Sequence, residues 1–343
     1  MTTEAPWEGL RQVRKIHAIN HPERGVLLSA LTRDYTIVFN SQLAANGTTW
    51  GGWGDPALGR TDIHKIAGAQ HALGLGQIWA LNMAGKLMGK IPERGGDWEE
   101  VGGPALMALA TVPEQVYADP KDPRFARSRL VASLQQLWGI TRDRRLISAR
   151  VVGQPLDQDL PTWNDAPPVF AVAATVKNDG LGQVWVLNMQ QQLRSSTRNA
   201  ANSESPYDWS PWSKENWNGA PQLRAIAASQ HRGAIASRDA VHEGPAPDHI
   251  VLGITQKYEL IASILRSPNP VWGPWSPPYW NGCAGAVLDV TAVQQSDGCL
   301  QVWAVTYGGY LAMCRQTKRG GDWTAWQTAD FGWSRANEPV FVQ

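Results

Sequence analysis

One motif is repeated along this chain, and the repetition constrains the fold more than any single residue does. Each copy begins with an apolar segment that in four copies contains a tryptophan, twice as Val-Trp, passes through a tight turn, and reaches a second, Leu-centred apolar segment. In most copies a segment with one or two tryptophans follows. The first apolar segments lie at 27–32, 77–82, 136–141, 183–188, 250–255 and 301–306. Six copies at a spacing of roughly 50 residues predict a repeat architecture of short strands.

A further segment, rich in small residues, precedes the first apolar segment of every copy. Its six copies lie at 16–19, 66–69, 107–110, 172–175, 226–229 and 290–293. Small side chains are expected on strands that converge on an axis, where little room is left. We therefore predict an all-β fold: a six-bladed β-propeller with four-stranded antiparallel blades, forming one domain over residues 1–343. A seven-bladed propeller is the alternative, and a β-sandwich is the runner-up because it leaves the period unexplained.

The two chain ends carry partial copies of the motif. Residues 338–342 resemble another first strand, and residues 6–8 resemble a fourth strand. A propeller must cover its last open sheet edge, so pairing of the N- and C-terminal strands is predicted to close the ring.

Two of the intervals between copies are stretched by insertions. Residues 113–135 and 231–249 both fall between the first and second strands of a copy. In an up-and-down blade these loops leave on the same face, and long loops on a rigid scaffold are often functional. That face is the expected location of the functional site.

Charge and composition exclude several classes of partner. The net charge is +1 and no basic stripe is present, so neither nucleic acid nor an anionic membrane surface is an expected partner. No apolar run approaches the length of a membrane span, and the start does not resemble a signal peptide. The expected location is the cytoplasm, or outside the cell after release without a cleaved signal. Oligomeric state is left open.

The cysteines and the common catalytic motifs give no indication of a metal or cofactor. Cys283, Cys299 and Cys314 have neither the even number of a disulfide framework nor the spacing of a zinc site. We expect them to be reduced, half-buried strand residues. No Gly-x-Ser-x-Gly, His-Glu-x-x-His or phosphate-binding glycine loop is present. No cofactor and no metal are therefore expected.

Tryptophan is unusually frequent, with 18 tryptophans against five phenylalanines. The first tryptophan of each Trp-x-x-Trp pair is expected to pack between blades. The second, and a trailing tryptophan that often precedes Asn-Gly, fall near strand ends, where an indole can present its face to a sugar and its N–H to a hydroxyl. The candidates for ligand binding are Trp53, Trp212, Trp217, Trp275, Trp280, Trp326 and Trp333.

A second group of candidates lies at the end of the small-residue strand. His21, His71 and His231 recur there, and the polar residues Gln70, Gln230 and Gln295 occupy neighbouring places. On a propeller these side chains would surround the mouth of the central channel. They are either an ordinary solvated rim or a pocket in which an imidazole acts as acid or base near neutral pH. A three-histidine metal site is disfavoured, because the ring would have to bring all three onto one ion.

The Val-Trp strand, the glycine-containing turn, the Leu strand and the Trp-x-x-Trp segment, as in 301–326, resemble the tectonin-type and fucose-binding β-propeller lectins. The resemblance implies several shallow sugar sites in clefts between blades. The fucose-binding members carry an Arg at the start of strand two and a Glu at the end of strand three. In this sequence the first place holds Gln77, Gln136, Gln183 and Gln301, and the second holds residues such as Lys90, Arg150 and Arg315. The Arg/Glu pair is therefore absent.

Three functions are consistent with these features. The first is a non-catalytic, carbohydrate-binding propeller that recognises glycans through tryptophan-lined sites. The second is a lectin-like propeller recruited as a cofactor-independent enzyme of cyclase or lyase type, with one tryptophan- and histidine-lined pocket at the channel mouth for a small apolar or polar ligand. The third is a protein-interaction scaffold. The fold alone does not choose among them.

Overall fold

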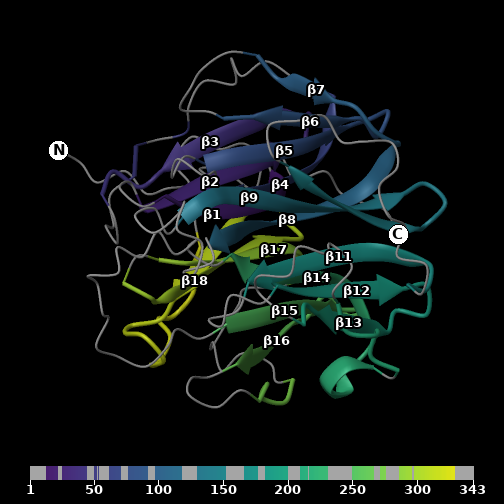
Figure 1. The fold of residues 1–343 in the computed structure, drawn as a ribbon. Coiled ribbons are helices and arrows are strands. Elements are labelled where there is room, and N and C mark those ends of the chain that lie inside the picture. Colours follow the sequence, from purple (N-terminus) through teal and green to yellow (C-terminus); the bar gives the residue numbers. More distant parts are fainter. Residues whose placement is uncertain are drawn as a thin grey trace, which may run out of the picture.

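The computed structural model describes residues 13–21, 25–44, 50–51, 53, 62–70, 76–91, 97–117, 130–151, 166–176, 182–199, 209–214, 216–230, 249–265, 271–275, 286–295 and 297–328. These residues form six antiparallel blades that follow one another around a common centre, as Figure 1 shows. The fold is the six-bladed β-propeller that the repeat predicts.

Each blade contains three named strands or more. Blade by blade, they are β1 (Val13–His21), β2 (Gly25–Thr32) and β3 (Ile37–Ser41); β4 (Ile63–Gln70), β5 (Gly76–Asn82), β6 (Leu87–Lys90) and β7 (Glu99–Val101); β8 (Leu106–Tyr117), β9 (Leu130–Thr141) and β10 (Leu146–Val151); β11 (Val169–Val176), β12 (Gly182–Asn188) and β13 (Leu193–Thr197); β14 (Leu223–Gln230), β15 (His249–Thr255) and β16 (Leu260–Leu265); and β17 (Val287–Gln294), β18 (Leu300–Thr306), β19 (Leu311–Arg315) and β20 (Gln327–Thr328). A short 3-10 helix, η4 (Trp217–Gly219), follows the fourth blade.

Among the described residues, the predicted fourth strand is reduced to a single bridge in the first, fourth and fifth blades, whereas in the sixth blade the bridge precedes β20. In all four blades the first tryptophan of a Trp-x-x-Trp pair forms the bridge to the end of the third strand. The pairs are Gln42 with Trp50, Arg198 with Trp209, Leu265 with Trp272, and Gln316 with Trp323.

The core is divided into six apolar clusters, and each cluster lies between two neighbouring blades. The tryptophans of the second strands, Trp79, Trp138, Trp185 and Trp303, are among the largest fully buried side chains. One cluster joins Leu28 and Trp50 of the first blade to Val293 and Trp303 of the sixth. Apolar packing therefore joins the first blade to the sixth, as it joins the other neighbouring blades.

The same hairpin turn joins the second and third strands of every blade. A Thr or Asn ends the second strand, and the residue three places later has a φ between 62° and 81°. The Asn82 Oδ1 atom accepts hydrogen bonds from the backbone N–H groups of Ala84 and Lys86, at 3.0 and 2.9 Å. A short polar side chain that bonds to nearby backbone stabilises a tight turn of this kind.

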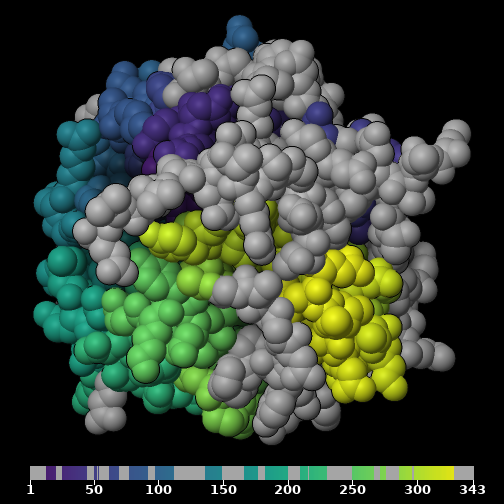
Figure 2. Space-filling view, turned by 180° about the vertical axis from the view of Figure 1, so that it is seen from behind, coloured from purple at the N-terminus to yellow at the C-terminus, as the bar shows by residue number. Residues whose placement is uncertain are grey.

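These turns also connect one blade to the next. The carbonyl of the left-handed turn residue accepts a hydrogen bond from the first residue of the following inner strand, as in Leu106 N–H to Gly85 O at 2.8 Å and Val287 N–H to Tyr258 O at 2.9 Å. The bond from Val13 N–H to Gly309 O, at 3.1 Å, joins the first blade to the sixth in the same way. Figure 2 shows this neighbourhood from behind, with the yellow sixth blade beside the purple first blade near the middle.

Three of the sequence expectations fall partly outside the described residues. The terminal segments 6–8 and 338–342, whose pairing is predicted to close the ring, lie outside them. The insertion 113–135 is in part an extended hairpin, because β8 continues to Tyr117 and pairs with β9 from Leu130. Of the insertion 231–249, only His249, the first residue of β15, is described. The location of both insertions on one functional face stays a prediction.

The two cysteines that the structure describes are more deeply buried than expected. Cys314 lies on β19 with 0% of its surface exposed, and Cys299, which precedes β18, is 6% exposed. Both are free thiols. Burial raises the pKa of Cys299 to about 11, so this thiol is protonated at neutral pH. Cys283 lies outside the described residues.

Candidate functional site

The first tryptophan of each pair packs between blades, as predicted. The Trp50 ring contacts the Trp303 ring edge-on, with ring centroids 5.4 Å apart. Trp209 meets Trp138 at 5.1 Å, and Trp272 meets Trp185 at 5.5 Å, again edge to face. In each contact the partner ring comes from the second strand of the preceding blade, so these indoles form the seams of the ring.

The second tryptophans do not share one environment. Trp326 is buried, with 9% of its surface exposed, so the expectation that it is exposed was wrong. It belongs to the apolar cluster between the fifth and sixth blades. Trp53 and Trp212 are half-buried and pack against the neighbouring clusters. Trp280 and Trp333 lie outside the described residues.

Between the fourth and fifth blades, the structure brings two of the predicted indoles together. Trp217 and Trp275 have ring centroids 6.1 Å apart, and Trp272 lies 5.2 Å from Trp217. All three are half-buried, and the fully buried Trp185 lies beneath them, 5.6 Å from Trp217. We call Trp217, Trp272 and Trp275 the indole cluster.

Asn218 fixes the indole cluster across the junction. It has a φ of 52°, and its amide Nδ2 donates to Gly273 O at 2.6 Å and to Ser263 Oγ at 3.1 Å. Both acceptors belong to the fifth blade, whereas Asn218 follows the fourth. The Trp217-Asn218-Gly219 segment is therefore held against the neighbouring blade before any ligand arrives.

The polar candidates at the ends of the inner strands are only partly described. His21, Gln70 and Gln230 end β1, β4 and β14, but the structure describes only their backbones. His71 and His231 lie outside the described residues. Gln295 is buried and its Nε2 donates to Gln301 Oε1 at 3.3 Å, so it stabilises the interior, contrary to its predicted place on a ligand-binding rim.

Several of the residues that replace the Arg and Glu of the fucose-binding lectins are buried. Gln136, Gln183 and Gln301 are each no more than 5% exposed. Lys90, at the end of β6, is also buried, and this burial lowers its pKa although Asp97 acts in the opposite sense. Side chains buried in this way are poorly placed to replace an Arg/Glu pair.

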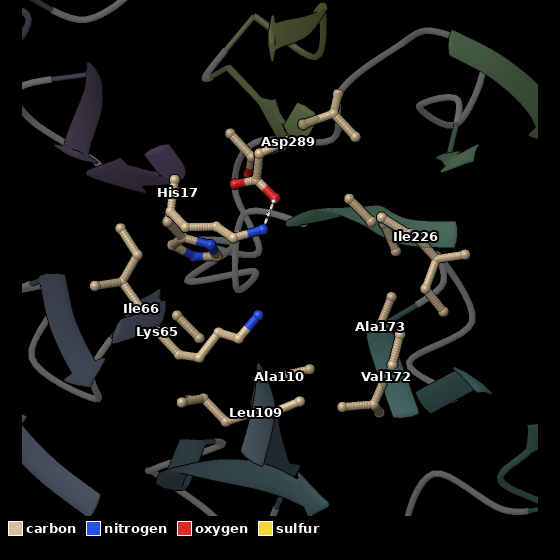
Figure 3. Close-up of a pocket in the computed structure, with 18 of the residues that line it drawn as sticks. His17, Lys65, Ile66, Leu109, Ala110, Val172, Ala173, Ile226 and Asp289 are labelled. Carbon is tan, nitrogen blue, oxygen red and sulfur yellow. Dashed lines mark hydrogen bonds and ion pairs between the residues drawn. The ribbon is translucent and has the colours of Figure 1, made fainter. Parts of the chain in front are cut away.

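A separate cavity lies on the axis of the ring, which Figure 3 shows in close-up. Its volume is about 250 Å³, and all six inner strands contribute to its wall. Most of the wall consists of small or branched apolar side chains, as the small-residue pattern predicts. We call this space the central cavity.

Most of the charged groups of the central cavity lie on three adjacent strands, β17, β1 and β4, and Arg224 of β14 is a further one. Lys15 Nζ forms an ion pair with Asp289 Oδ1 at 2.8 Å, and the other oxygen of Asp289 accepts the Ile16 N–H at 3.0 Å. Lys65 extends into the same space from β4. Burial, together with the charge of Lys15, lowers the pKa of Lys65 to about 8, although Asp289 acts in the opposite sense.

His17 completes this charged side of the wall. Its Nε2 lies 2.8 Å from Gly68 O, and a carbonyl can only accept, so Nε2 carries the proton. Burial lowers the pKa of His17 to about 4, which outweighs the opposite effects of the Gly68 carbonyl and Asp289. The ring is therefore neutral at physiological pH.

Sequence reasoning missed Lys15, His17, Lys65 and Asp289. They could have been found by comparing the repeats, because these residues interrupt a series of alanines at equivalent places on the inner strands. Among the described residues, no group of three or more His, Cys, Asp or Glu side chains could hold a metal ion. No helix within the described part of the chain is long and apolar enough to span a membrane.

Comparison with known proteins shows similarity in fold. The chain is similar to the fucose-specific lectin from Aleuria aurantia, with a TM-score of 0.63 and 13% identity over 95% of this chain and 100% of that one. It is also similar to AofleA from Arthrobotrys oligospora (TM-score 0.61, 12% identity, 93% and 87% coverage) and to the BP39L lectin from Burkholderia pseudomallei (0.56, 17%, 91% and 83%). No family model and no curated protein matches the sequence.

These similarities confirm the lectin-type propeller architecture. One report on the Aleuria lectin describes a six-bladed β-propeller, the blade number found here. At such low identity the similarity is one of fold and does not identify a ligand.

Proposed function

We propose that this protein is a non-catalytic, carbohydrate-binding propeller that recognises a glycan at the indole cluster between its fourth and fifth blades. The observation that carries the proposal is the convergence of Trp217, Trp272 and Trp275, all half-buried, at one blade junction. The binding of fucosides by structurally similar lectins supports the choice of ligand class.

The chemistry of the cluster suits a sugar ring. An indole offers a flat apolar face that can cover the C–H side of a pyranose, and its N–H can bond to a hydroxyl. The rings of the cluster are held edge to face, with interplanar angles of 76° and 84°. The backbone of this region is fixed by the Asn218 bonds to Gly273 and Ser263, which reduces the entropy that binding would otherwise lose.

The blade junctions are not equivalent, and the cluster is expected to dominate binding. In the described part of the chain, a third indole joins a Trp-x-x-Trp pair at the junction of blades four and five, where Trp217 contacts Trp272 and Trp275. At the junction of blades five and six the corresponding Trp326 is buried. The proposal therefore predicts one stronger site, with weaker sites adding avidity if they are occupied.

The test begins with a glycan array probed with the whole protein, followed by calorimetry on the glycans retained. Trp217→Ala is expected to weaken binding by about tenfold or more, the size of effect seen when a stacking ring is lost. Trp98→Ala is the matched control, because Trp98 is a half-buried indole at the junction of blades one and two. Failure of the folded wild type to retain any glycan, or equal binding by the two variants, would overturn the proposal.

A further inference from the structure

The inner strands show where this propeller departs from its own repeat. At the third residue of the inner strand, β8, β11 and β14 carry Ala108, Ala171 and Ala225. The equivalent residues of β1, β4 and β17 are Lys15, Lys65 and Asp289. These three strands are neighbours in the ring, so the departures form one charged sector on the wall of the central cavity.

The charges in this sector leave one positive charge without a partner. The Lys15 and Asp289 charges cancel in their ion pair, and His17 is neutral. Within the part of the chain that the structure describes, the Lys65 amine makes no hydrogen bond or ion pair. Figure 3 shows this amine reaching toward the middle of the cavity.

The remaining charged groups near the cavity do not neutralise Lys65. Arg224 lies over the Tyr258 ring, 3.9 Å from its centroid, and adds no negative charge. His64, the neighbour of Lys65 on β4, has a pKa lowered by burial and then by the charge of Lys65. Among the wall residues that the structure describes, those from β8 and β11 include no titratable side chain. An ammonium enclosed in this way destabilises the fold unless an anion accompanies it.

The opposite side of the cavity is mostly apolar, although Arg224 of β14 and Thr111 of β8 also line it. Leu109, Val172 and Ile226 face the charged sector from β8, β11 and β14, and alanines fill the places between them. The volume of about 250 Å³ is near the lower end of the range for small-molecule pockets. The cavity therefore has one cationic wall and one apolar wall, and it has room for one small molecule.

We propose that the central cavity binds one small organic carboxylate, whose anionic group pairs with Lys65 and whose apolar body contacts Leu109, Val172 and Ile226. A carboxylate matches the single unpaired ammonium in charge, and a charge-assisted hydrogen bond in a desolvated site is strong. The apolar body gains from leaving water against the opposite wall. This site is distinct from the indole cluster, and neither site requires the other.

The test is calorimetric titration of the full chain with sodium phenylacetate and its neutral isostere phenylacetamide, extended to acetate, butyrate and cinnamate. We expect phenylacetate to bind with one-to-one stoichiometry, and phenylacetamide to bind at least about tenfold more weakly. Acetate should be weaker than butyrate, because it has little apolar surface to bury. Raising the pH from 7 to 9.5 should weaken phenylacetate binding, because Lys65 loses its proton near pH 8.

Two variants assign the binding to Lys65. Lys65→Met keeps the length and apolar part of the side chain and should weaken phenylacetate binding by about tenfold or more. Lys257→Met removes an exposed lysine from a hairpin turn and should bind as the wild type does. Thermal unfolding confirms that each variant is folded. Absence of binding by all four carboxylates at millimolar concentration, equal binding of phenylacetamide, or unchanged binding by Lys65→Met would each overturn the proposal.

Discussion

The backbone N–H of Val13 donates to the carbonyl oxygen of Gly309, 3.1 Å away, and so joins the first inner strand to the last hairpin turn. Residues 296 positions apart in the chain thus make the same contact that Val287 makes with Tyr258 between consecutive blades. The ring is closed by the interaction that holds its other junctions, so the closing junction should be as strong as an internal one.

Removing this donor should destabilise the fold. We expect Val13→Pro to lower the free energy of unfolding by about 1–3 kcal/mol more than Val13→Ala, because both lose the Val side chain but only proline lacks the N–H. We expect a similar difference in the free energy of unfolding between Val287→Pro and Val287→Ala. Urea denaturation of the four variants measures it. A large difference at Val287 with none at Val13 would show that the ring is not closed at this point.

The side-chain bonds in the hairpin turns should also be measurable. Asn82→Ala removes an acceptor for the N–H groups of Ala84 and Lys86, and we expect a loss of about 1–2 kcal/mol. Asn82→Asp keeps an oxygen acceptor in the same place and should lose clearly less. Equal destabilisation of the two variants in chemical denaturation would contradict a role for the side-chain oxygen.

His17 should make the stability depend on pH. Its pKa in the folded protein, about 4, lies below the ordinary value of 6.5, so the unfolded chain binds more protons between these values. The contribution is fully present above pH 6.5 and is lost as the pH falls toward 4. The loss is on the order of 3 kcal/mol. The free energy of unfolding measured from pH 7 to 4 should fall more steeply for the wild type than for His17→Gln, and parallel curves would argue against a buried, neutral imidazole.

Lys65 should cost stability at neutral pH. Its pKa of about 8 in the fold lies below the ordinary value of 10.5, so the charged form is disfavoured by folding. This cost is present below pH 8 and disappears as the pH rises toward 10.5. We expect ligand-free Lys65→Met to be more stable than the wild type at pH 7, by about 1–3 kcal/mol. The difference should shrink in denaturation curves at pH 10, and a variant less stable at pH 7 would contradict the expectation.

The architecture could be predicted from the sequence because it depends on features that recur. Small residues recur on all six inner strands, and a Thr or Asn recurs at all six turns. Tryptophans such as Trp138 and Trp185 recur on four of the six second strands. Agreement among repeated local signals is what specifies a fold, and one divergent copy does not change it.

The sites were harder to predict, because they depend on neighbours that the sequence separates. Trp326 and Trp275 occupy equivalent places in their motifs, yet Trp326 is buried in the cluster of blades five and six while Trp275 lies in the indole cluster. Which strands cover an indole is decided by packing between blades. Lys15 and Asp289 form an ion pair although 274 positions separate them, and only ring closure brings them together.

A crystal structure of the protein with the glycan retained most strongly on an array would locate the binding site. We expect electron density for a sugar ring against Trp217 and Trp275, at the junction of blades four and five. A sugar bound only at another place on the propeller would contradict this expectation.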